Sequence, residues 1–89
     1  MFRGQREEIL NKLRPYFGTP ELDEELARLP EKQQEYVLAL YGLDGQETGT
    51  AKEIASIYGV SESVVRSGAK NALRKLNHPS VLERLQKWD

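Results

Sequence analysis

The segment from Thr50 to Ser80 most constrains what this chain can fold into. It contains two helical patterns that a Gly59-Val60-Ser61 turn separates, and a proline ends the second one. Thr50 and Glu53 have the spacing of a capping box, which marks a helix start, and Ser61 is a favourable N-cap for the second helix. A short helix, a tight turn with glycine and a second helix with a polar outer face form a helix-turn-helix, which presents its second helix to a DNA groove. The segment therefore predicts a helical unit suited to nucleic-acid binding.

The remaining segments also have helical periodicity, and no strand pattern competes with it. An amphipathic helix is expected from Arg6 to Leu13, ended by Pro15, and Tyr16-Phe17-Gly18 is expected to form a loop. Thr19, followed by a proline, has the pattern of an N-cap and a first helical position. Pro30 opens a further helix, which Gly42 ends.

The chain should end in one more helix. Pro79 breaks the second helix of the helix-turn-helix, and Ser80 with Glu83 forms another capping box, which predicts a last helix that starts at Ser80. We therefore expect an all-α fold, a small helical domain of five to six helices with a helix-turn-helix. Residues 1–18 are expected to form an N-terminal helix and loop, and residues 19–89 the helix-turn-helix domain.

The apolar faces of these helices predict the core. Its expected members are Leu22, Leu26, Leu29, Tyr36, Val37, Leu40, Tyr41, Ile54, Ala55, Tyr58, Val65, Ala69, Ala72, Leu73, Leu76, Leu82, Leu85 and Trp88. Gly68 stands in mid-helix, where glycine costs roughly 1 kcal/mol relative to alanine. Either it permits the close approach of another backbone, or it is tolerated there without a packing role.

Composition limits the class of protein. Eighty-nine residues suit one domain, and the absence of cysteine excludes disulfides and thiolate metal sites. The apolar runs are far shorter than the ~20 residues that span a bilayer, and the N-terminus lacks the apolar core of a signal peptide. A cytoplasmic protein without a membrane partner is expected.

Charge is distributed unevenly along the chain. The net charge is −1, which argues against a high-affinity, free-standing DNA binder. Residues 21–50 carry eight acidic and two basic side chains, whereas residues 63–78 carry four basic ones and no carboxylate. The chain is therefore polarised, with an acidic middle and a basic second helix of the helix-turn-helix.

The outer face of that helix could contact DNA. Arg66 and its serine neighbours suit base edges, because arginine binds guanine with two hydrogen bonds, and Lys70 and Arg74 would approach phosphates. Backbone N–H groups at Thr50 could bind a further phosphate at a helix N-terminus. The alternative is a solvated face whose basic residues stabilise the helix dipole. The candidate DNA-binding residues are Thr50, Lys52, Glu62, Ser63, Arg66, Ser67, Lys70 and Arg74.

No residue pattern predicts an enzyme. His78, the single histidine, has no second metal ligand near it in sequence and is interpreted as a helix-end residue. The acidic cluster Glu21–Glu25 could suggest a metal site, but carboxylates at a helix N-terminus stabilise the helix itself. There is no nucleophile–base pair, phosphate-binding glycine loop or zinc spacing, so no catalytic residue, metal or cofactor is expected.

Residues 29–80 resemble the fourth conserved region of bacterial sigma-70-type RNA polymerase sigma factors. The motifs that carry the resemblance are Leu29-Pro30, Leu40-Tyr41-Gly42-Leu43-Asp44, Lys52-Glu53-Ile54-Ala55, Tyr58-Gly59-Val60-Ser61 and Ala72-Leu73-Arg74-Lys75-Leu76-Asn77-His78-Pro79-Ser80. The last string is the most specific, and the family has Arg where this chain has Asn77.

The resemblance implies two interaction surfaces. One is an apolar groove that grips the flap-tip helix of the polymerase β subunit, and its candidate residues are Tyr41, Leu43, Leu73 and Leu76. The other is the recognition helix, which reads the upstream (−35) promoter element in the family. The family opens this helix with Arg-Glu-Arg followed by Arg-Gln, where this chain has Glu62, Ser63, Val64, Arg66 and Ser67. Only Arg66 is retained, and each lost bidentate group removes ~1–3 kcal/mol of discrimination, so recognition of the usual hexamer is not expected.

Three functions remain open at this point. The first is a sigma-like regulator that docks on the polymerase flap and contacts duplex promoter DNA. The second is a co-activator or inhibitor that binds polymerase or a sigma factor without reading DNA. The third, a free-standing repressor, would need a dimer. The N-terminal helix, with Phe2, Ile9, Leu10 and Leu13, could bind another sigma or regulatory protein. Both a stand-alone regulator and an excised domain fit the chain, and the Met1 start favours the former.

Overall fold

The computed structural model describes residues 2–87, with side chains from Arg6 onward, and this part of the chain contains helices and no strand. The elements are α1 (Phe2–Leu13), the 3-10 turn η1 (Arg14–Tyr16), α2 (Pro20–Ala27), α3 (Glu31–Tyr41), α4 (Ala51–Tyr58), α5 (Glu62–Leu76) and α6 (Pro79–Gln86). The predicted all-α fold is confirmed.

Local capping explains where most of these helices begin and end. The Thr50 hydroxyl accepts the Glu53 N–H at 3.1 Å while the Glu53 carboxylate accepts the Thr50 N–H at 2.9 Å, which completes the predicted capping box of α4. The Ser61 hydroxyl accepts the Val64 N–H at 3.2 Å and caps α5. Gly59 ends α4 at φ +68°, a left-handed conformation that only glycine adopts without strain.

The start of α6 differs from the prediction. The helix begins at Pro79 and its N-cap is His78, whose Nδ1 accepts the Ser80 N–H at 3.1 Å. The predicted capping box of Ser80 and Glu83 is therefore wrong. Proline has a fixed φ and no N–H, so it suits the first helical position, and the residue before it has to supply the cap. Trp88, expected to close this helix on the core, lies outside the described residues.

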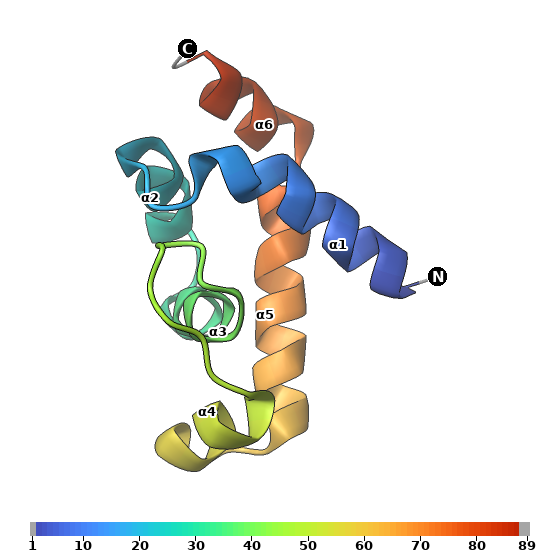
Figure 1. Ribbon diagram of the computed structural model, residues 1–89, viewed down its shortest axis with the longest axis vertical. Helices are drawn as coiled ribbons and strands as arrows, with labels where there is room; N and C mark the ends of the chain where they lie inside the picture. The colour runs from blue at the N-terminus through green and yellow to red at the C-terminus, as the bar shows by residue number, and fades with distance from the viewer. Residues whose placement is uncertain (1, 88–89) are drawn as a thin grey trace.

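The helix α5 is the axis of the fold (Figure 1). The helix α3 packs against its side and is seen nearly end-on in this view, α4 packs against its N-terminal end, and α1 crosses its C-terminal half. The helix α2 lies beside α3 and α6 at the same end of the molecule. The turn between α4 and α5 is therefore at one end of the molecule, and α1 crosses α5 near the other end.

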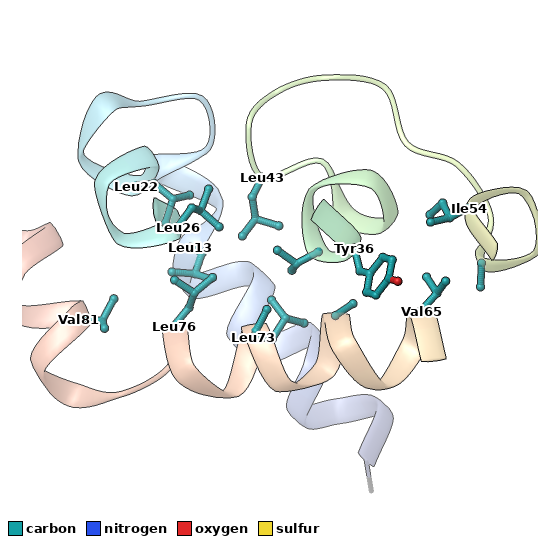
Figure 2. Close-up of a cluster of buried hydrophobic side chains, with 14 of the residues drawn as sticks. Leu13, Leu22, Leu26, Tyr36, Leu43, Ile54, Val65, Leu73, Leu76 and Val81 are labelled. Atoms are coloured by element: carbon teal, nitrogen blue, oxygen red, sulfur yellow. The ribbon is translucent and has the colours of Figure 1, made fainter. Parts of the chain in front are cut away.

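One continuous core joins all six helices (Figure 2). Its buried members are Leu13, Leu22, Leu26, Tyr36, Val37, Leu43, Ala51, Ile54, Ala55, Val65, Ala69, Ala72, Leu73, Leu76, Val81 and Leu85. Five expected members are only half-buried at its margin: Leu29, Leu40, Tyr41, Tyr58 and Leu82. Leu13, by contrast, is fully buried, so the C-terminal end of α1 belongs to this core.

Gly68 allows a close approach, but the neighbour is an aromatic ring. A Cβ atom at this position would lie 2.5 Å from Cδ2 of Tyr36. The Tyr36 ring in turn packs edge-on against Tyr58, with centroids 5.2 Å apart. The expected backbone neighbour is therefore replaced by a side chain, because a large ring on α3 needs the space that a missing side chain on α5 leaves.

A buried ion pair joins α2 to α6. Glu25 is 5% exposed, and its carboxylate accepts two hydrogen bonds from Arg84, from Nε at 2.7 Å and from Nη2 at 2.8 Å. These bonds lower the pKa of Glu25, against the effect of burial, and the charges of Arg84 and Arg28 act in the same direction. One member of the acidic cluster is thus an anchor for the last helix.

Candidate nucleic-acid interface

The candidate DNA-binding side chains lie on the two helices of the helix-turn-helix, α4 and α5. Thr50, which caps α4, is exposed, and so is Lys52 in its first turn. On α5, Ser63, Arg66, Ser67, Lys70 and Arg74 are exposed and Glu62 is half-buried. The inward residues Val65, Ala69 and Leu73 keep this helix in one rotational position. The polar face predicted for α5 is therefore presented to solvent.

Arg66 is engaged by its own helix. Its Nη2 lies 3.2 Å from Oε1 of Glu62, one turn earlier. Exposed pairs of this kind contribute only ~0.3–0.5 kcal/mol, so the arginine can leave its partner at little cost. The carboxylate remains beside the arginine and opposes the approach of a phosphate.

The phosphate-binding position expected at the N-terminus of α4 is occupied by a side chain of the same helix. The Thr50 N–H, expected to bind a phosphate, donates to the Glu53 carboxylate. Hydrogen bonds from the Thr50 backbone and side chain lower the pKa of Glu53, so a carboxylate occupies this helix N-terminus at neutral pH. A phosphate at the Thr50 N–H would have to displace it.

A basic cleft lies between α1 and α5, which we call the α1–α5 cleft. It has a volume of about 540 Å³. Its lining residues are Arg6, Glu8, Ile9, Lys12, Tyr41, Arg66, Lys70, Leu73, Arg74 and Asn77. Two cations of α1 therefore extend the basic face of α5. Sequence reasoning missed this feature, because only the tertiary fold brings residues 6–12 next to residues 66–77.

The four residues expected to bind the polymerase flap lie in the core or at its margin. Leu43, Leu73 and Leu76 are at most 2% exposed, and Tyr41 is half-buried. Leu13 of α1 lies beside Leu76 in the core (Figure 2). In this conformation the three leucines are core residues, and Tyr41 and Leu73 reach the α1–α5 cleft.

Two large apolar side chains are exposed near the turn of the helix-turn-helix. Ile57 on α4 is 79% exposed, and Val64 in the first turn of α5 is 46% exposed. Val64 stands where the resembling family has an arginine, so this face is less polar than the prediction implies. The departure was visible in the sequence, but the exposure of Ile57 was not.

The described residues hold no group of His, Asp or Glu side chains arranged to bind a metal ion. No helix among them has the length and apolarity needed to cross a membrane. His78 is a helix cap, as its position beside Pro79 indicated.

Comparisons with known proteins agree with this architecture. The family model for "Sigma-70, region 4" matches residues 26–78, which run from α2 to the end of α5. The RNA polymerase sigma factor SigA of a Bacillus species is 35% identical over 66 residues, and that of Listeria monocytogenes is 32% identical over the same length. Each alignment covers 74% of this chain but 18% of the relative, so the chain spans less than a fifth of those proteins. There is no significant match among solved structures. The match over more than half of its length shows that this chain belongs to the sigma-70 region 4 family of helix-turn-helix transcription domains.

Proposed function

We propose that this protein acts in transcription as a sigma-like factor that docks on the flap of the RNA polymerase β subunit and contacts promoter DNA with α5. The observation that carries the proposal is the capped α4–α5 helix-turn-helix, with Arg66, Lys70 and Arg74 exposed along one helix of a region 4 domain. Arg66 would reach base edges, and the two residues nearer the C-terminus would contact phosphates.

The DNA contact is expected to be weak and strongly dependent on salt. The net charge of −1 gives little general attraction, so binding has to come from the few cations on α5 and α1. Fluorescence anisotropy with a labelled promoter duplex over a salt series measures it. We expect Arg74→Ala to weaken binding and reduce the salt slope by about one unit. Lys87→Ala, at an exposed position beyond α6, is the matched control. Absence of binding by the wild type at low salt would exclude direct contact with DNA.

The polymerase contact is best tested at Tyr41. Leu76 is 1% exposed, and truncating such a leucine costs ~2–5 kcal/mol of stability, so loss of binding by Leu76→Ala would be ambiguous. Tyr41 is half-buried at the margin of the core. In a pull-down with a β-flap fragment, we expect Tyr41→Ala to bind less and Ile57→Ala, at an exposed position outside the cleft, to bind as the wild type does. Equal retention of all three proteins would contradict this docking site.

A second function, docking on polymerase or a sigma factor without reading DNA, is favoured by the Glu62–Arg66 pair and by the exposed Val64. Both features reduce the basic, hydrogen-bonding character that a DNA-reading helix needs. Flap binding with no DNA binding at low salt would select this function over the first.

A further inference from the structure

We propose that α1 is a displaceable cover, which occupies the helix-binding groove of this domain in cis and leaves when a partner helix enters. The partner is the flap helix of polymerase, so its identity rests on the proposed function. The position and seating of α1 do not depend on that function.

The helix α1 lies where an incoming helix would bind. It precedes the segment that matches the family, residues 26–78, and packs against α5 within that segment. Its Leu13 is fully buried beside Leu76, one of the residues expected to form the groove. Seating an amphipathic helix is a common way to fill an apolar groove, and here the chain supplies such a helix itself.

The two ends of α1 are seated differently. Leu13 at its C-terminal end is fully buried, whereas Ile9 and Leu10 are only half-buried. The α1–α5 cleft lies on one side of the helix. On the other side is a second hollow of about 610 Å³, which Leu10 shares with Leu40, Tyr41 and Ala51. Both hollows are open to solvent, and Ile9 and Leu10 are only half-buried, so the N-terminal half of α1 buries less apolar surface and is the more loosely held half. This half points away from the body of the domain (Figure 1).

Among the described side chains, Arg6 makes two weak contacts with Tyr41 that help to hold the N-terminal half of α1. The Arg6 guanidinium lies 5.9 Å from the centre of the Tyr41 ring, and its Nη1 is 3.5 Å from the Tyr41 hydroxyl, at the limit of a hydrogen bond. Across the α1–α5 cleft, the cations of α1 face Arg66, Lys70 and Arg74, and Glu8 is the acidic residue among the cleft lining. Cations therefore line both walls of the cleft, and Glu62 offsets the charge of Arg66 on the α5 side.

The connection after α1 provides a pivot. Pro15 interrupts the helical hydrogen bonding in η1, and Gly18 adopts φ +78° and donates its N–H to the Leu43 carbonyl at 2.9 Å. This bond anchors the loop to the core, so α1 can swing away about residues 14–17 while α2 to α6 stay in place.

The first experiment compares full-length variants in their affinity for the β-flap fragment of a Bacillus RNA polymerase. Ile9→Asp places a charge under the loose half of α1, and Asn11→Asp adds the same charge at an exposed position of the same helix. A cover reduces apparent affinity by the fraction of molecules that are open, so we expect Ile9→Asp to bind about tenfold more tightly than the wild type, with Asn11→Asp unchanged. Equal affinity of Ile9→Asp and the wild type would overturn the cover, while the docking function would stand.

The second experiment cross-links α1 to α5 so that α1 cannot leave the groove. Glu8 and Arg74 both line the α1–α5 cleft, and the chain has no native cysteine. A Glu8→Cys, Arg74→Cys variant keeps the net charge and can be joined by a short bismaleimide. We expect the cross-linked protein to lose flap binding and the unmodified variant to retain it. Retention after cross-linking would contradict the proposal.

Amide hydrogen exchange tests the proposal about α1 independently of the proposed flap docking. In the free protein, amides of residues 9–13 should exchange faster than those of α5, and addition of the flap fragment should remove their remaining protection. If no variant binds the flap, the docking function fails, but fast exchange in α1 still supports a loosely seated cover. Exchange of α1 at the rate of α5 would refute the cover in either case.

Discussion

Gly68→Ala is a substitution for which local and tertiary arguments give opposite signs. In an exposed helix the change stabilises by ~1 kcal/mol, because alanine loses less backbone entropy than glycine. Here the added Cβ would lie 2.5 Å from Cδ2 and 3.3 Å from Cε2 of Tyr36. Favourable carbon–carbon contacts lie at about 3.5–4.0 Å, so the overlap is about 1 Å.

The Tyr36 ring has little freedom to move away. It is 5% exposed, and its neighbour Tyr58 packs against it with the planes 77° apart. Overpacking of this kind costs ~1–3 kcal/mol. After subtraction of the gain in helix propensity, we expect a net loss on the order of 1 kcal/mol in the free energy of unfolding.

Urea unfolding followed by circular dichroism measures the effect. With a slope of ~1–3 kcal/mol per molar, a loss of this size lowers the midpoint by about 0.3–1 M. Ser67→Ala, at the adjacent exposed position, is the control for propensity alone and should raise the midpoint slightly. In a Tyr36→Leu background, Gly68→Ala should become stabilising, which gives a coupling energy of ~1–2 kcal/mol between the two sites. If Gly68→Ala raises the urea midpoint of the otherwise wild-type protein, the close contact between Gly68 and Tyr36 is refuted.

Three further predictions concern the ion pair, a helix cap and the core. Arg84→Ala should cost about 1.5–3 kcal/mol, because it leaves the buried Glu25 carboxylate without its charged hydrogen-bond partner, whereas Lys87→Ala should change the unfolding free energy by less than about 0.5 kcal/mol. The pKa of Glu25 is lowered in the folded state, so the pair contributes fully above the unfolded value of 4.5 and less as pH falls through the folded value. The stabilities of the wild type and Arg84→Ala should therefore converge in acid, and a constant difference down to low pH would contradict the assignment. Ser61→Ala should cost ~0.5–2 kcal/mol by removing the cap of α5, measured by thermal unfolding against Ser67→Ala. Leu76→Ala should cost ~2–5 kcal/mol, and a cost near zero would show that Leu76 is not buried in the core.

The helices could be predicted because their limits depend on neighbours within a few residues. The Thr50–Glu53 capping box, the Ser61 cap and the glycine at the end of α4 all lie where the sequence indicated. The start of α6 was misplaced because two local signals compete there, Ser80 with Glu83 and Pro79 with His78. The first helix also begins earlier than expected, at Phe2 and not at Arg6. The polar outer face of α5 followed from its apolar inner face, since a helix that buries one side must expose the other.

The candidate sites could be predicted only in part. The residues of the recognition face are where periodicity placed them, but the engagement of Arg66 by Glu62 and of the Thr50 N–H by Glu53 reduces what this face offers to DNA. The candidate groove residues come from the family resemblance. The packing of α1 against α5 could not be predicted in this way, because α1 lies outside the segment that matches the family.

The sequence by itself determined the helices, their caps and the membership in the sigma-70 region 4 family, because each depends on residues close together in the chain. The tertiary structure decided which distant side chains meet. Glu25 pairs with Arg84, 59 positions away, and Tyr36 fills the space at Gly68. It also decided that α1 lies over Leu76. These contacts depend on how whole helices pack, and the free energy of burying their shared apolar faces selects that packing from many arrangements that the local pattern allows.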